Sequence, residues 1–141
     1  GRINYNRSKT GKLYSIKVVG EAKSLLEKYK SDNDTLLLSL LTEDEVSVRE
    51  KLPKRIRQKR KTLNKWLKKV GEAVGLELPL STYVFRYSSA GICRELGYSK
   101  DLISQSLGHS YGLKVTDAYL NDYDVSLVDE MNQAVVDAIV K

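Results

Sequence analysis

The 141-residue sequence predicts one mainly α-helical domain with a small N-terminal β-hairpin, an α+β fold. Three observations predict this class. Apolar and polar residues alternate loosely over the first seventeen positions, apolar residues then recur every three or four positions, and glycine or proline separates the segments. A hydrophobic content of 41% allows a chain of this length to bury a core without disulfides.

The hairpin comes first in the chain. Ile3 and Tyr5 mark one strand, Leu13 and Ile16 mark the other, and Gly11 lies in the turn between them. A helix follows, because Ala22, Leu25, Leu26 and Tyr29 repeat at helical spacing until the polar residues 31–34 end it. The apolar run at 36–41 is too short to assign.

A long helical region begins near Glu43. Pro53 should break or kink it, and Gly75 should end it. After Pro53 the helix has an apolar stripe, which we expect to be buried, at Leu63, Trp66, Leu67, Val70 and Val74.

Shorter helices are predicted in the C-terminal half. One is capped by Ser81 or Thr82 and ends at Gly97, and the next is capped by Ser99 and ends at Gly108. After a segment that follows Gly112, a terminal amphipathic helix is marked by Val128, Met131, Val135 and Ala138.

Charge is concentrated in one region. The net charge is +6, and the stretch 49–69 holds eleven basic residues but one acid, Glu50. Such a run is often a solvated helix face, but one sign without counter-charges favours a polyanionic partner. We therefore expect phosphate contacts from the densest part of the run, at Lys54, Arg55, Arg57, Lys59, Arg60 and Lys61.

Several classes of protein do not fit the composition. The single cysteine, Cys93, cannot form an intramolecular disulfide, which favours a reducing cytoplasm. With His109 as the one histidine, the chain cannot assemble a zinc site, and we expect no metal or cofactor. No apolar run reaches the length of a membrane span.

The C-terminal half carries the residues needed to break a phosphodiester without a metal. That reaction takes a nucleophile, cations around the phosphoryl oxygens and an acid for the leaving alkoxide. A tyrosine ester of phosphate keeps the bond energy, so the strand can be rejoined without ATP. Three segments supply such groups in order: Tyr83-Val84-Phe85-Arg86, Leu107-Gly108-His109-Ser110 and Thr116-Asp117-Ala118-Tyr119-Leu120.

With these spacings, the chain resembles the catalytic domain of tyrosine recombinases, the phage-integrase family. The N-terminal Arg7-Ser8-Lys9-Thr10-Gly11 resembles the family's β-hairpin, so the resemblance covers nearly the whole chain. Tyr119-Leu120 and the following Asp124-Val125-Ser126-Leu127-Val128-Asp129 resemble integrases of mobile elements in Bacteroides-like bacteria. The resemblance implies the tyrosine recombinase catalytic-domain fold and an enzyme that cuts and rejoins duplex DNA.

The resemblance also implies roles for individual residues. Tyr119 attacks the scissile phosphate, Arg86 holds its non-bridging oxygens, and Lys9 protonates the departing 5′-oxygen. His109 hydrogen-bonds the phosphate or assists proton transfer. Tyr83 stands where the family often has histidine, and its phenol is a poorer base because its ordinary pKa is about 10.

Each role has a simpler structural interpretation. His109 alone fits a residue that satisfies a helix end, Arg86 a surface ion pair, and Lys9 a solvated turn. Tyr119 is one of nine tyrosines, and Tyr123, four residues on, is the alternative nucleophile. The spacing of Thr116 and Leu120 around Tyr119 favours Tyr119.

One element of the family pattern is missing. The family's active site has two arginines, and the first lies upstream of the hairpin, where this sequence offers no match. We therefore expect residues 1–141 to be the partial catalytic domain of an N-terminally truncated recombinase, without the upstream DNA-clamping domain. On its own this chain should bind DNA weakly and not recombine it.

The expected partners are duplex DNA and further copies of the chain. The family implies a tetramer on DNA, formed through the C-terminal helix at 126–140, although that helix equally fits a fold back onto its own domain. The location implied is the bacterial cytoplasm, at the nucleoid. Two other functions stay open: a non-catalytic basic helical DNA-binding module, and DNA relaxation of the type IB topoisomerase kind.

Overall fold

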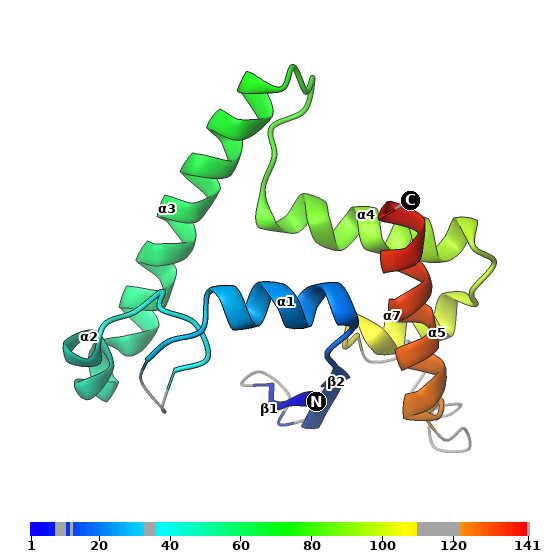
Figure 1. Cartoon of the computed structure of the whole chain (residues 1–141), viewed down its shortest axis with the longest axis horizontal. Coiled ribbons are helices and arrows are strands. Elements are labelled where there is room, and N and C mark those ends of the chain that lie inside the picture. Colours follow the sequence, from blue (N-terminus) through cyan, green and yellow to red (C-terminus); the bar gives the residue numbers. More distant parts are fainter. Residues whose placement is uncertain (8–10, 12, 33–35, 110–121, 141) are drawn as a thin grey trace. The chain divides into compact units, whose positions relative to one another are not determined.

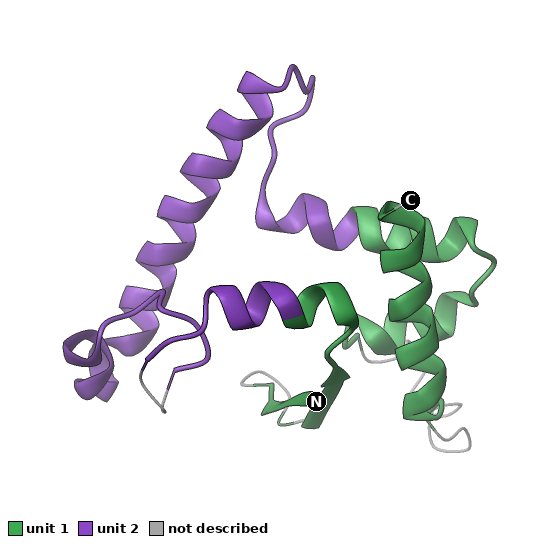
Figure 2. Cartoon of the chain, viewed as in Figure 1, with its two compact units in different colours: residues 1–23, 88–141 green, residues 24–87 purple. Residues whose placement is uncertain are grey.

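The structure, a computed structural model, describes residues 1–7, 11, 13–32, 36–109 and 122–140. It is mainly helical with a two-stranded antiparallel sheet at the N-terminus, as the sequence predicts (Figure 1). The chain divides into unit 1, residues 1–23 and 88–141, and unit 2, residues 24–87 (Figure 2). The division falls within two helices, α1 (Gly20–Lys28) and α4 (Thr82–Glu95).

The hairpin pairs β1 (Arg2–Asn6) with β2 (Leu13–Lys17). Tyr5 and Tyr14 are opposite each other in the register, and their rings stack with centroids 5.3 Å apart. The turn closes where the Gly11 amide donates to the Arg7 carbonyl at 2.8 Å, and Gly11 has φ of +68°. The glycine predicted for the turn therefore occupies the left-handed conformation that favours glycine.

Unit 1 has its core where α4, α5 (Lys100–Ser106) and α7 (Val125–Ile139) meet. Cys93, Leu102, Met131 and Val135 are buried there, and Met131 is fully inaccessible. Burial raises the pKa of the Cys93 thiol, which keeps this side chain in its neutral form. The terminal helix thus packs on its own chain in this structure, through the residues that its periodicity predicts.

Caps define where these helices begin. The Ser99 hydroxyl accepts from the Leu102 amide at 3.2 Å, and the Asp124 carboxylate accepts from the Ser126 amide at 2.7 Å. Of the two hydroxyls predicted to cap α4, that of Ser81 accepts from Val84 at 3.4 Å. The Ser99 and Asp124 caps satisfy amides at the helix start, whereas the Val84 amide also donates to the Ser81 carbonyl at 3.0 Å.

Unit 2 confirms the prediction that the helical region is broken at Pro53. It consists of α2 (Glu43–Ser47), a 3₁₀ turn η1 (Arg49–Lys51) and α3 (Leu52–Ala73). Pro53 lies in the first turn of α3 and so begins a helix, because proline lacks only an amide that would have no partner there. The isolated bridge between Lys30 and Leu38 shows that the apolar run at 36–41 is not helical.

The apolar stripe of α3 is not buried, contrary to the prediction. Trp66 is 59% exposed, and Leu63, Val70 and Val74 are exposed as well. Periodicity identifies an apolar face but does not determine how much of it other elements cover. Within unit 2, α3 contacts α2 and η1 near its start. In its middle, Asn64 Oδ1 accepts from the Thr82 amide at 3.0 Å, and near its end Gly71 lies against Leu80.

Replacing Met131 tests the core of unit 1. Met131→Ala should lower the free energy of unfolding by about 2–5 kcal/mol, because it removes a fully buried side chain and leaves a cavity. Chemical denaturation followed by circular dichroism measures the change. The control on the same helix is Ile139→Ala, which is 64% exposed in the wild type and should change stability by less than about 0.5 kcal/mol. Equal effects from the two substitutions would contradict this core.

Candidate functional site

The hairpin packs against the turn that follows α5. The Arg7 guanidinium donates from Nη1 to the Gly108 carbonyl, across 101 positions of sequence. The Tyr14 hydroxyl also lies against Gly108, where a Cβ would collide with it. Gly108 has φ of +71°, so the turn needs glycine both for its backbone conformation and for the approach of Tyr14. The segments 7–11 and 107–110, which the sequence assigns to phosphate chemistry, are therefore in contact through Arg7 and Gly108.

Tyr14 has a buried hydroxyl. Among the residues that the structure describes, that oxygen has no hydrogen-bond partner. No role for Tyr14 was predicted from the sequence. The hairpin register pairs Tyr14 with Tyr5, and this pairing could have identified the two residues as an aromatic pair.

Arg2 anchors the other end of the hairpin to the terminal helix. Its Nη1 donates to Asp129 Oδ2 at 2.6 Å, its Nη2 donates to Oδ1 at 3.1 Å, and its Nε donates to the Ser15 hydroxyl at 2.7 Å. The bond to Asp129 raises the pKa of Arg2, which stays charged. Arg2, which matches no catalytic position by pattern, thus joins β1, β2 and α7.

His109 directly follows this turn and its side chain is exposed. Its amide donates to the Ser104 carbonyl at 3.0 Å, and the Gly108 amide donates to the Gln105 carbonyl at 2.9 Å. These bonds close the end of α5 and fix the backbone from which the imidazole projects. Part of the simple interpretation thus holds, since His109 completes a helix end through its backbone.

Arg86 and Tyr83 lie one helical turn apart on α4. Arg86 is half-buried, whereas Tyr83 is 61% exposed and packs obliquely against Tyr87 with centroids 5.8 Å apart. Arg86 belongs to unit 2 and His109 to unit 1, so their convergence stays a prediction. Lys9 and Tyr119 lie outside the described residues.

Tyr123, the alternative nucleophile, is described and is bound to α5. Its amide donates to Gln105 Oε1 at 2.7 Å, and its carbonyl accepts from Gln105 Nε2 at 2.9 Å. Its hydroxyl is 3.3 Å from that of Ser99, the cap of α5. These contacts favour a structural role, because they hold the phenol at the start of α5.

Two side chains of the basic run have partners within unit 2, and one of those partners is a carboxylate. Lys59 pairs with Glu45 at 3.2 Å, and the Arg55 guanidinium donates to the Asp44 carbonyl at 2.8 Å. A capping box between Thr42 and Glu45 orients α2 for these contacts. The Thr42 amide, followed by Lys59, lowers the pKa of Glu45, which stays ionised beside the helix.

The remaining basic residues form a second face of α3. Lys54, Arg57 and Lys61 follow each other at intervals of three and four, are exposed, and make no ion pair with a carboxylate in the described part of the chain. Arg60 is exposed as well. The N-terminus of α3 has no acid in its first turn, so the helix dipole adds to this positive charge. We call Lys54, Arg57 and Lys61 the cationic face.

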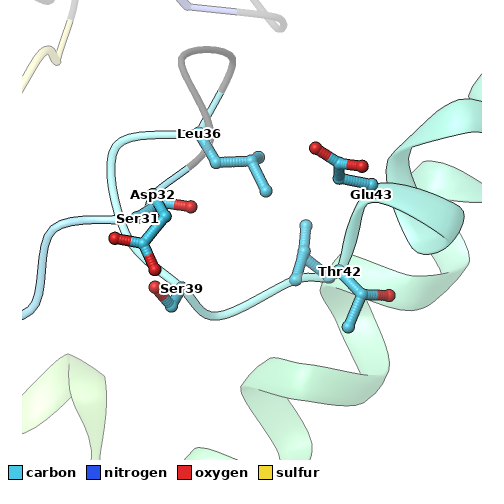
Figure 3. Close-up of a pocket in the computed structure, with 7 residues that line it drawn as sticks. Ser31, Asp32, Leu36, Ser39, Thr42 and Glu43 are labelled. Atoms are coloured by element: carbon cyan, nitrogen blue, oxygen red, sulfur yellow. The ribbon is translucent and has the colours of Figure 1, made fainter.

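A pocket elsewhere in unit 2 does not suit a phosphate. It has a volume of about 260 Å³ and is lined by Ser31, Asp32, Leu36, Ser39, Leu41, Thr42 and Glu43. Figure 3 shows the carboxyl groups of Asp32 and Glu43 around it, and its lining includes no basic side chain. Negative charge without a counter-cation would repel a polyanion.

Comparisons with known proteins identify no relative: no family model matches the chain, and neither curated proteins nor solved structures give a match. Among residues 1–7, 11, 13–32, 36–109 and 122–140 there is no group of three metal-ligating side chains. Within the same residues, no helix has the length and apolar character needed to cross a bilayer.

The cationic face predicts which charges bind a polyanion. A triple variant, K54Q/R57Q/K61Q, should weaken duplex DNA binding and reduce the slope of log K against log salt by about 0.9 for each phosphate that is no longer neutralised. Fluorescence anisotropy at several salt concentrations measures both quantities. A control with the same change in net charge is K23Q/K28Q/K30Q, on and beside α1. If the control loses as much affinity and slope as the α3 variant, net charge alone explains binding and the cationic face has no special role.

Proposed function

We propose that this chain is the catalytic domain of a tyrosine recombinase, which cuts and rejoins duplex DNA through a 3′-phosphotyrosyl intermediate. The observation that carries the proposal is the contact of the hairpin, through Arg7 and Tyr14, with Gly108. A shared site requires the Lys9 hairpin and the Leu-Gly-His-Ser turn to meet, although they are far apart in sequence.

The proposed reaction assigns one chemical task to each group. The Tyr119 phenol gives its proton to the His109 imidazole and its oxygen bonds to phosphorus, while the bond from phosphorus to the 5′-oxygen breaks. Arg86 and His109 stabilise the charge that builds on the non-bridging oxygens, and Lys9 gives its proton to the leaving 5′-oxygen. The Tyr83 phenol, which lies beside Arg86, acts as a hydrogen-bond donor. Attack by the 5′-hydroxyl of another strand reverses these steps and releases Tyr119.

The charge on α3 supports duplex DNA as the substrate. Lys54, Arg57 and Lys61 present three cations along one face, at spacings set by the helix. Phosphate contacts of this kind position DNA without reading its sequence, as an enzyme needs for holding its substrate. The same face also fits a non-catalytic DNA-binding module, so binding alone does not separate the two functions.

Covalent adduct formation separates an enzyme from a binding module. In the full-length protein, Tyr119→Phe should abolish the protein–DNA adduct on a nicked suicide duplex and leave DNA affinity unchanged, because it removes only the attacking oxygen. Denaturing gel electrophoresis of labelled DNA detects the adduct. Tyr123→Phe is the matched control and should retain it, since Tyr123 is bound to α5.

The same assay tests the arginine. Arg86→Ala should slow adduct formation by about 100-fold or more, the usual effect of removing a group that stabilises transition-state charge.

Loss of the adduct in Tyr123→Phe with retention in Tyr119→Phe would contradict the assignment of the nucleophile. Wild-type protein that binds the duplex but forms no adduct would favour the binding module.

A further inference from the structure

We propose that Tyr14 is a positioning residue that holds the turn carrying His109 against the hairpin. For the reaction proposed above, on which this inference rests, the imidazole must stay in place beside the phosphate. Within unit 1, no residue to which we assign a chemical step holds the His109 imidazole in place.

The geometry at Gly108 places two hairpin side chains against the turn. The Tyr14 hydroxyl lies where a Cβ of residue 108 would be, and Arg7 Nη1 is 3.1 Å from the same position. Arg7 also donates to the Gly108 carbonyl. Both contacts fall on the residue directly before His109, so they restrain the backbone that carries the imidazole.

Tyr14 meets the turn through the hydroxyl end of its ring. The hydroxyl oxygen and the ring carbon that carries it are the atoms nearest to the Cβ position of residue 108. The hydroxyl is buried, and no described residue offers it a hydrogen bond. The ring also stacks on Tyr5, and a phenylalanine would retain that stacking. Packing against the turn is therefore the contribution that the described contacts assign to Tyr14.

The hairpin reaches the turn through few side chains. A two-stranded hairpin is marginal alone, so it must pack on another element. Its far end is tied to α7 by Arg2 and Asp129, but that ion pair does not involve the turn after α5. Tyr14 and Arg7 thus supply the contacts between the hairpin and the turn in the described part of unit 1.

Amide hydrogen exchange in the 141-residue chain tests this proposal without DNA or catalysis. In Tyr14→Leu, the His109 amide should exchange at least about tenfold faster, because opening of the turn no longer has to displace the ring. The Met131 amide, in the core of the same unit, should keep its protection. The matched control is Tyr5→Leu, which removes the stacked partner ring on the same hairpin but no contact with Gly108, and should leave His109 exchange unchanged.

A further variant tests whether the Tyr14 ring itself holds the turn. Tyr14→Phe should exchange like the wild type, because the ring stays. Unchanged exchange of His109 in Tyr14→Leu would overturn the proposal, and so would equal acceleration at His109 and Met131, since that shows a general loss of stability.

Strand cleavage by the full-length protein gives the functional readout. Tyr14→Leu should lower the cleavage rate on bound suicide substrate at least about tenfold while DNA affinity stays constant, because misplacement of a catalytic group affects the chemical step. Altered exchange in a protein that never forms the adduct would support the positioning role and refute the recombinase. Normal cleavage by Tyr14→Leu, in a wild type that does form the adduct, would refute the positioning role alone.

Discussion

The contact of the hairpin with Gly108 is the constraint on which the proposed site depends. Gly108 has no side chain and a positive φ, and both properties let the Tyr14 ring and the Arg7 guanidinium reach the backbone before His109. A two-stranded hairpin has no core of its own, so this contact and the Arg2–Asp129 pair determine where it lies in unit 1. The core around Met131 then fixes α5, the helix that ends at this turn.

Contacts within unit 2 also determine which of its cations stay exposed. The region that is rich in lysine and arginine begins beside α2, which holds Lys59 through the Glu45 carboxylate and Arg55 through the backbone carbonyl of Asp44. Lys54, Arg57 and Lys61 lie in the same turns of α3 but on another face of the helix. A helix with this charge and with an exposed Trp66 gains little from burial, so a polyanion would relieve its self-repulsion.

Local patterns in the sequence predicted the elements well. The alternation around Tyr5, the cap at Ser99 and the spacing of Met131 and Val135 all act over a few residues, and the structure contains each of them. The prediction that the stripe around Trp66 is buried was wrong, because the pattern shows an apolar face but not whether another element covers it. Pro53 was placed correctly as a boundary, but it begins a helix instead of kinking one.

The candidate site was predictable only in part. The resemblance selected the hairpin and the turn at Gly108, which are in contact, yet the side chains that make the contact, Tyr14 and Arg7, were not identified. Arg7 and Gly108 are 101 positions apart, and periodicity in the sequence does not predict contacts between residues so far apart. The roles of Lys9, Arg86 and Tyr119 rest on the resemblance and stay predictions.

The proposed enzyme requires distant side chains to act together on one phosphate. A crystal structure of the full-length protein with duplex DNA and orthovanadate at the cleavage position tests this most directly, because vanadate adopts the geometry of the phosphoryl transition state. We expect the Tyr119 oxygen as an apical ligand of vanadium, Lys9 beside the 5′-oxygen on the opposite side, and the equatorial vanadate oxygens hydrogen-bonded by Arg86 and His109. A complex in which Arg86 and His109 contact separate phosphates and Tyr119 is not a ligand would contradict it.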